Sequence, residues 1–149
     1  KFIEVLTPTA THKKVIGFDT FSGFSTLAQE DGGANPSIQK QVGGLSSEPF
    51  LDEFESLMKL HNEDGVIPSN RASIVKGDVD LYEPTLTILR DCWDRLVIGG
   101  VLVLDEYATS QWPGESKAWD EFAQARGIRT PVKRFPWANA PGGYIVKEA

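Results

Sequence analysis

Five acidic residues could carry out chemistry, and they fall at three points of the chain. Asp19, the pair Asp78 and Asp80, and the adjacent Asp105 and Glu106 each follow a short apolar segment and precede a loop or a helix. A carboxylate can accept hydrogen bonds from both hydroxyls of a ribose, can remove a proton from a hydroxyl group, and offers the hard oxygen that Mg²⁺ prefers. Acids at the ends of strands also cap turns and helices without any further role, so both interpretations stay open.

Each of the three short apolar segments that precede these acids is typical of a β-strand. They cover residues 14–18, 72–75 and 101–104. The last segment is entirely aliphatic and follows two glycines, which predicts a strand buried on both faces, as in a parallel sheet covered by helices. Ligands of open α/β sheets bind at the carboxyl ends of the strands. If the strands are parallel, the sheet therefore brings all three groups of acids to one edge.

Amphipathic segments predict three helices. The first covers residues 47–64, the second begins near Pro84, and the third covers residues 115–126 and is closed by Gly127. The side chains expected on their apolar faces are Phe50, Phe54, Leu57 and His61 on the first helix, Leu86, Leu89, Trp93 and Leu96 on the second, and Ala118, Trp119, Phe122 and Ala125 on the third.

The alternation of strands and helices predicts an α/β fold of three layers, organised as a single domain over residues 1–149. Segments 132–135 and 144–146 predict a C-terminal antiparallel hairpin at one edge of the sheet. Between the regular elements, segments 20–46 and 108–114 are loops, and long loops in compact domains are usually lids or binding loops.

These loops contain three aromatic residues whose side chains could be exposed: Phe21, Phe24 and Trp112. Exposed apolar side chains often mark interaction sites. We therefore expect them to form a lid or the contact surface of a homo-oligomer.

The composition excludes several classes of protein. Hydrophobic residues make up 40% and charged residues 24%, which is ordinary for a globular domain. The net charge of −6 disfavours a general nucleic-acid binder, which needs a basic surface, and no apolar run is long enough to span a bilayer. Cys92 is the only cysteine, which rules out an internal disulfide and a thiolate metal site and favours a reducing, cytoplasmic location. We expect neither nucleic acid nor a membrane as a partner.

Several motifs in order resemble the macrocin O-methyltransferase family. The motifs are Ile16-Gly17-Phe18-Asp19-Thr20-Phe21-Ser22-Gly23-Phe24, Val75-Lys76-Gly77-Asp78, Asp78-Val79-Asp80-Leu81-Tyr82-Glu83-Pro84-Thr85, Gly99-Gly100 through Asp105-Glu106-Tyr107, Trp112-Pro113-Gly114-Glu115, Asp120-Glu121-Phe122, and Pro136-Trp137 with Gly143-Tyr144-Ile145-Val146. The resemblance covers nearly the whole chain. It implies a Rossmann-like methyltransferase sheet and a class I S-adenosylmethionine-dependent enzyme. Such enzymes methylate hydroxyls, typically on sugars of natural products and often with Mg²⁺.

The resemblance also implies which residues would bind the cofactor. Asp19 would bind the ribose, and Thr20 and Phe21 would line the same pocket. Gly77 and Asp78 would lie beside the adenine ring.

By the same resemblance, a metal ion and the acceptor molecule would lie next to the cofactor. Asp78 would be a metal ligand and the catalytic base, and Asp105 and Glu106 would complete the metal site. Tyr107 and Trp112 would lie near the small-molecule acceptor. For Trp112, packing within its loop is an equally good interpretation.

The sequence departs from the family pattern in two places. The chain begins inside what resembles the helix after the glycine-rich turn, so the first strand and that turn are missing. In addition, Asp78 belongs to two motifs that the family separates by a helix and a strand, and a parallel crossover needs on the order of a dozen residues. The missing strands would be the two central ones. Either the 149 residues are part of a longer polypeptide, or the deletion is real and the sheet is rearranged.

The leading hypothesis is an S-adenosylmethionine-dependent O-methyltransferase assisted by a divalent metal, acting on a sugar or a glycosylated natural product. The alternative is a non-catalytic remnant of the fold that acts as a binding module, because the glycine-rich turn is missing. A dehydrogenase is the weakest hypothesis, since no glycine-rich fingerprint lies between a strand and a helix.

Overall fold

The computed structural model describes residues 14–24, 27–32, 41–44, 46, 50–63, 72–75, 81–137 and 142–148. In chain order its elements are β1 (Val15–Phe18), the short helix η1 (Gln29–Asp31), α2 (Leu51–Glu63), β2 (Ala72–Val75), α3 (Tyr82–Cys92), the short helix η3 (Trp93–Arg95), β3 (Val101–Leu104), α4 (Pro113–Arg126) and β4 (Gly143–Val146). The α/β character expected from the sequence is confirmed. Of the helices in these ranges, none is long and apolar enough to cross a bilayer.

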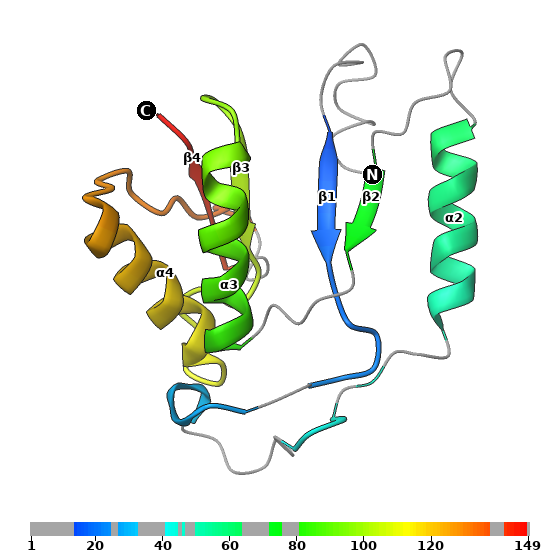
Figure 1. The fold of residues 1–149 in the computed structure, drawn as a ribbon, viewed down its shortest axis with the longest axis horizontal. Helices are drawn as coiled ribbons and strands as arrows, with labels where there is room; N and C mark the ends of the chain where they lie inside the picture. Colours follow the sequence, from blue (N-terminus) through cyan, green and yellow to red (C-terminus); the bar gives the residue numbers. More distant parts are fainter. Residues whose placement is uncertain are drawn as a thin grey trace.

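The strands form two pairs (Figure 1). β1 and β2 are parallel, with Val15 opposite Ala72, and α2 lies beside them. β3 and β4 are antiparallel, with Leu102 opposite Ile145, and α3 and α4 lie on this side of the molecule. Within the described ranges no ladder of hydrogen bonds joins the two pairs, because no described strand lies between β1 and β3. One continuous sheet, as expected from the sequence, is therefore not observed.

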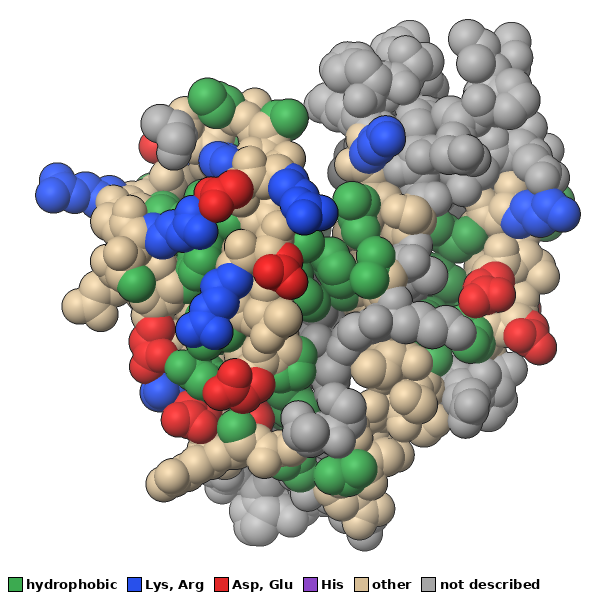
Figure 2. All heavy atoms as spheres, viewed as in Figure 1, with side chains coloured by type: hydrophobic (Ala, Val, Ile, Leu, Met, Phe, Trp, Pro, Cys, Tyr) green, Lys and Arg blue, Asp and Glu red, His purple; other side chains and the backbone are tan. Residues whose placement is uncertain are grey.

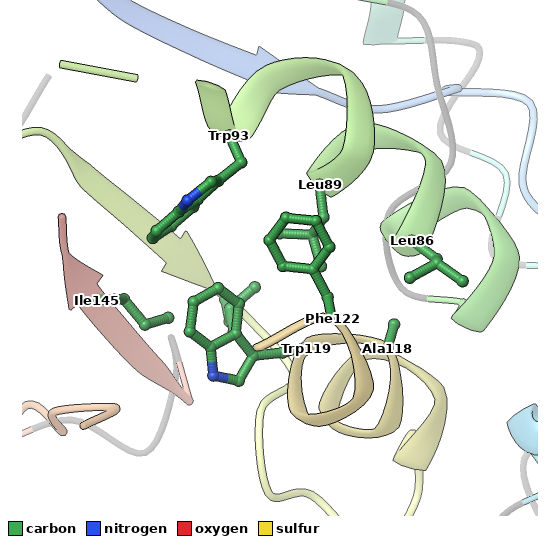
Figure 3. Packing of buried hydrophobic residues seen from close by; sticks show 8 residues of the cluster. Leu86, Leu89, Trp93, Ala118, Trp119, Phe122 and Ile145 are labelled. Carbon is green, nitrogen blue, oxygen red and sulfur yellow. The ribbon is translucent and has the colours of Figure 1, made fainter. Parts of the chain in front are cut away.

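The hydrophobic core lies between the α3–α4 pair and one face of β3–β4. Trp93 packs on Trp119 with 5.4 Å between ring centroids, and the rings of Trp93 and Phe122 are T-shaped with 6.0 Å between centroids (Figure 3). The other buried members of this cluster are Leu86, Leu89, Leu104, Ala118 and Ile145. The apolar stripe predicted on the second helix is thus confirmed, as are three of the four positions predicted on the third.

The fourth position on the third helix, Ala125, was predicted wrongly and is exposed. In the last turn of α4 the core contacts Ala123 instead, and Ile128 follows the helix into the same core. Gly127 ends the helix as expected, with a φ of 65° that a residue with a side chain rarely adopts.

β3 is covered on one face only, so the prediction of a strand buried on both faces was wrong. Leu104 is 3% exposed and Leu102 packs against the core, whereas Val101 and Val103 are 50% and 51% exposed. Side chains alternate between the two faces of a strand, and α3 and α4 cover only one of them. Among the described elements, this sheet therefore has a single helical layer instead of one on each face.

The predicted C-terminal hairpin is only partly formed. Lys133 and Tyr144 form a single antiparallel bridge, and the hydrogen-bonding partner of β4 is β3. Pro131 and Pro136 flank the segment 132–135, and proline lacks the N–H group that a ladder needs. This segment is consequently not a strand.

Helix α2 forms where the sequence predicts it, but most of its apolar face is exposed. Leu57 and Leu60 are 55% and 56% exposed, and Phe50, just before the helix, is 64% exposed. Phe54 contacts the ring of Phe21, with 5.5 Å between centroids. The side chain of His61 lies outside the described part of the chain.

Candidate active site

The loops that follow the first three strands meet in a small buried cluster at the carboxyl end of the strands. Phe24 follows β1, Leu81 lies between β2 and α3, and Trp112 follows β3. These side chains are 3%, 0% and 7% exposed, and the rings of Phe24 and Trp112 lie 5.1 Å apart. The fold therefore brings together the loops that carry the predicted cofactor and acceptor residues.

Asp19 caps the turn that follows β1. Its carboxylate accepts a hydrogen bond from the backbone N–H of Phe21 at 2.7 Å, and its side chain stays exposed. The neighbouring Thr20 donates from its hydroxyl to the carbonyl of Gly23 at 2.9 Å. These local bonds fix the turn, and they leave Asp19 on the surface at the strand end where a ribose ligand was predicted.

Phe21 is held in an unusual backbone conformation within this turn. Its φ is 59°, in the left-handed region that costs energy for a bulky side chain. The hydroxyl of Ser46 donates to the carbonyl of Phe21 at 3.0 Å, and the ring packs against Phe54 of α2. Two segments distant in sequence thus hold Phe21 in place.

The turn after β3 is built around a buried acid, Glu115, that sequence reasoning missed. Glu115 is 4% exposed, and its two carboxylate oxygens accept the backbone N–H groups of Asp105 at 3.2 Å and of Glu106 at 2.8 Å. It lies in the first turn of α4, which begins at Pro113. A proline at the first helical position followed by an acid in the first turn is a capping pattern, and this signal was available in the sequence.

The two predicted metal ligands after β3 differ in their surroundings. The side chain of Asp105 is exposed. The carboxylate of Glu106 accepts a hydrogen bond from the hydroxyl of Thr109 at 3.1 Å, and the same hydroxyl lies 2.9 Å from the carbonyl of Glu106. Both carboxylates carry the hard oxygen donors that suit Mg²⁺.

The third predicted metal ligand, Asp78, lies outside the described residues, together with Gly77 and Asp80. In the described ranges no group of three potential ligands among His, Cys, Asp and Glu is close enough to hold a metal ion. The base and adenine-site roles of Asp78 stay predictions for the same reason.

Tyr107 follows the acidic pair and is half-buried against the core. Its hydroxyl donates to the carboxylate of Asp120 at 3.1 Å. Burial raises the pKa of Tyr107 above its ordinary value, and the negative charge of Asp120 raises this pKa further. Tyr107 is therefore a protonated hydrogen-bond donor at neutral pH.

The aromatic residues expected to be exposed in the loops are buried. Phe21, Phe24 and Trp112 are 7%, 3% and 7% exposed within this single chain. They gain more by packing against one another and against α2 than by facing water. The expectation that these three aromatic side chains are exposed was therefore wrong, and a homo-oligomer stays a prediction.

Charged side chains of both signs are interspersed over the α3–α4 side of the molecule in the view of Figure 2. The acid–base pairs there include Lys117 with Glu121 at 2.8 Å, and Arg126 with Asp94. Acidic and basic side chains therefore lie side by side on this face.

Three solved structures with a similar fold are described as methyltransferases. The structure is similar to that of the calicheamicin methyltransferase CalS11, with a TM-score of 0.68 and 24% identity over 97% of this chain and 64% of that chain. A second structure, the apo form of CalS11, described as a TDP-rhamnose 3'-O-methyltransferase, gives a TM-score of 0.59 and 22% identity over 97% and 63% of the two chains. The O-methyltransferase NovP gives a TM-score of 0.56 and 16% identity over 97% and 64%.

The chain thus spans less than two thirds of the length of these proteins. No curated protein sequence matches it significantly. The sequence profile of the macrocin O-methyltransferase family (TylF) matches residues 6–140. The chain therefore belongs to the macrocin O-methyltransferase family.

Proposed function

We propose that this chain is an S-adenosylmethionine-dependent O-methyltransferase, or a portion of one, that methylates a hydroxyl of a sugar or a glycosylated small molecule. One observation carries the proposal beyond family membership. The loops after β1 and β3, which hold Asp19 and the Asp105–Glu106 pair, are joined through the contact of Phe24 with Trp112. A bound cofactor and an acceptor at this edge would therefore be neighbours.

In this proposal, the turn after β1 binds the cofactor. When bound, S-adenosylmethionine supplies an activated methyl group. Asp19 would accept hydrogen bonds from the ribose hydroxyls, because its exposed carboxylate has acceptor capacity beyond its bond to Phe21. Thr20 and Phe21 would line the ribose pocket, and Gly77 and Asp78 would lie beside adenine.

The acceptor hydroxyl would lie between the two loops and lose its proton to the carboxylate of Asp78. Its deprotonated oxygen would be the nucleophile for the activated methyl group that the bound cofactor supplies. Tyr107 and Trp112 would orient the acceptor. The single O–H of Tyr107 already donates to Asp120, so its oxygen would accept a hydrogen bond from the acceptor molecule. Because its hydroxyl is protonated, Tyr107 cannot act as the base at neutral pH.

We include a divalent cation in the proposal because the donor set suits one. Asp78, Asp105 and Glu106 would hold Mg²⁺ through carboxylate oxygens. The ion would supply positive charge beside the acceptor oxygen. Glu115 supports this role indirectly, since it fixes the backbone of both Asp105 and Glu106.

Two finer features belong to the same proposal. We interpret the β1–β2 and β3–β4 pairs as outer parts of one Rossmann-like sheet whose two central strands, the first strand among them, and one crossover are missing from this sequence. The coverage of 97% of this chain but 64% of CalS11 supports this interpretation. The single cysteine, Cys92, supports a cytoplasmic location, where disulfides are rare.

Calorimetric titration with S-adenosylmethionine tests the proposal on the wild type and on Asp19→Asn. The matched control is Asp52→Asn, which removes the charge of an exposed acid on α2. We expect saturable binding by the wild type and the control and weaker binding by Asp19→Asn. Transfer of a labelled methyl group to TDP-rhamnose or to its parent sugar then tests the acceptor class. A folded wild-type chain that shows no saturable binding would favour the alternative, a non-catalytic binding module.

A further inference from the structure

Asp31 is a buried acid to which neither the motifs nor the proposed chemistry assigns a role. It is the last residue of η1 in the loop after β1, and it is only 3% exposed. Burial of a carboxylate is costly unless hydrogen bonds compensate it. Hydrogen bonds must therefore offset the cost of burying this carboxylate.

The carboxylate of Asp31 joins two segments that are far apart in sequence. One oxygen accepts the N–H of Ala28 at 2.8 Å, within its own turn. The other accepts the N–H of Tyr82 at 2.7 Å, 51 residues away. Tyr82 is the first residue of α3, where N–H groups have no acceptor inside the helix, and the preceding Leu81 has no side-chain acceptor to offer. Asp31 thus caps α3 from a distant loop.

A third segment, the start of α4, is pressed against the same carboxylate. A Cβ atom built on Gly114 would lie 1.9 Å from an oxygen of Asp31 and 2.7 Å from the nitrogen of Tyr82. Only a residue without a side chain fits there. Gly114 comes two residues after Trp112, so this contact places the loop after β3 against the loop after β1.

The cap requires two acceptor oxygens, which an aspartate supplies and an asparagine does not. Each oxygen of Asp31 faces an N–H donor, Ala28 on one side and Tyr82 on the other. In Asp31→Asn an NH2 group replaces one of the two oxygens. In either orientation of the amide, this NH2 group would face one of the two backbone N–H donors and could not accept its hydrogen bond. The substitution therefore breaks one of the two bonds while the volume of the side chain stays nearly the same.

We propose that Asp31 is a positioning residue that keeps the cofactor loop after β1, the start of α3 and the acceptor loop after β3 in one arrangement. The inference rests on the proposed function, because those loops matter as cofactor and acceptor loops only in a methyltransferase. Asp31 would act through Asp19 and Trp112 and would not touch the reacting atoms.

The test compares Asp31→Asn with Glu30→Gln. Glu30 is the adjacent acid, and its ion pair with Lys117 at 3.6 Å is partly exposed, so its loss should matter little. The dissociation constant of S-adenosylmethionine, the KM of TDP-rhamnose and kcat are measured at a temperature where both variants are fully folded. Amide hydrogen exchange is followed for residues 27–32, for Tyr82 and for residues 105–112.

In Asp31→Asn we expect a rise on the order of tenfold in both the dissociation constant and the KM, and faster exchange in all three segments, since misplaced loops bind poorly. Glu30→Gln should stay within about twofold of the wild type. The variant Gly114→Ala crowds the same carboxylate from α4 and should shift the same constants in the same direction.

Unchanged binding and KM in Asp31→Asn, with faster exchange confined to residues 27–32 and Tyr82, would leave Asp31 a purely structural cap and overturn the inference. If the wild-type chain itself does not bind S-adenosylmethionine, the proposed function is rejected, and the role of Asp31 is rejected with it.

Discussion

The indole ring of Trp112 packs against the phenyl ring of Phe24, with 5.1 Å between the ring centroids and 43° between the ring planes. One residue follows β3 and the other follows β1, so this contact joins the two loops to which the chemistry is assigned. Leu81, with no exposed surface, completes the cluster. Of the two interpretations of Trp112 that the sequence left open, the structure thus supplies direct support for packing, and a role beside the acceptor stays a prediction.

The first prediction concerns the stability that Trp112 provides. Trp112→Ala should lower the free energy of unfolding by about 3 kcal/mol or more, because a large buried ring is lost and a cavity is left. Trp112→Phe, which keeps a ring against Phe24, should cost less. Urea unfolding measures both. Trp137→Ala is the control, since Trp137 is 79% exposed and should matter little. Equal stability of Trp112→Ala and the wild type would show that the packing of the indole contributes little to the fold.

The second prediction concerns Glu115, which holds the turn of the acidic pair. In Glu115→Gln one carbonyl oxygen replaces two carboxylate oxygens, so one of the N–H groups of Asp105 and Glu106 loses its acceptor. The free energy of unfolding should fall by about 1–3 kcal/mol. Methyl transfer should fall as well, because the acidic pair is displaced.

The control for Glu115 is Glu55→Gln, which removes an exposed acid on α2. Its urea unfolding curve should match that of the wild type. If Glu115→Gln and Glu55→Gln behave alike in both unfolding and turnover, the two backbone hydrogen bonds contribute little and the turn is held by other contacts.

The third prediction tests the metal ion through Asp105. The side chain is exposed, so Asp105→Ala should leave the unfolding curve nearly unchanged while it abolishes Mg²⁺-dependent turnover. Turnover of the variant should equal that of wild-type protein treated with a chelator. Asp91→Ala, an exposed acid on α3, should retain the wild-type response to Mg²⁺. Methyl transfer that is insensitive to both the chelator and Asp105→Ala would reject the metal assignment.

The sequence predicts the regular elements well because each depends on local patterns. The apolar segments at 15–18 and 101–104 form strands, and the stripes of α3 and α4 form the core, since alternation and helical spacing fix which side chains share a face. Whether anything covers a face depends on the rest of the chain. Val103 and Leu57 are apolar and yet half exposed, which no local pattern reveals.

In the candidate site too, the sequence reveals local patterns but not contacts between distant segments. Asp19, Asp105 and Glu106 stand out because they follow strands, whereas Asp31 lies in a polar loop, and the pattern at Glu115 indicates only the start of a helix. Their roles come from N–H groups 51 residues away for Asp31 and 9 and 10 residues away for Glu115. The capping pattern predicts an acid at the start of α4, but the sequence does not reveal which N–H groups Asp31 and Glu115 bind until the fold brings them together.

The last prediction concerns the pH dependence that Tyr107 introduces. Burial, and then the carboxylate of Asp120, raises its pKa above the ordinary value of 10.0, so the folded state favours the protonated hydroxyl. The stability that Tyr107 contributes is therefore complete below pH 10.0 and is lost as the pH rises through the higher pKa of the folded state. Above that ordinary value the free energy of unfolding should fall more steeply in the wild type than in Tyr107→Phe. Asp120→Asn keeps the tyrosine and removes the charge, and it should lower the pKa of Tyr107, as read from the ultraviolet absorbance of tyrosinate. A Tyr107 that ionises below its ordinary value would contradict both the burial of its ring and its bond to Asp120.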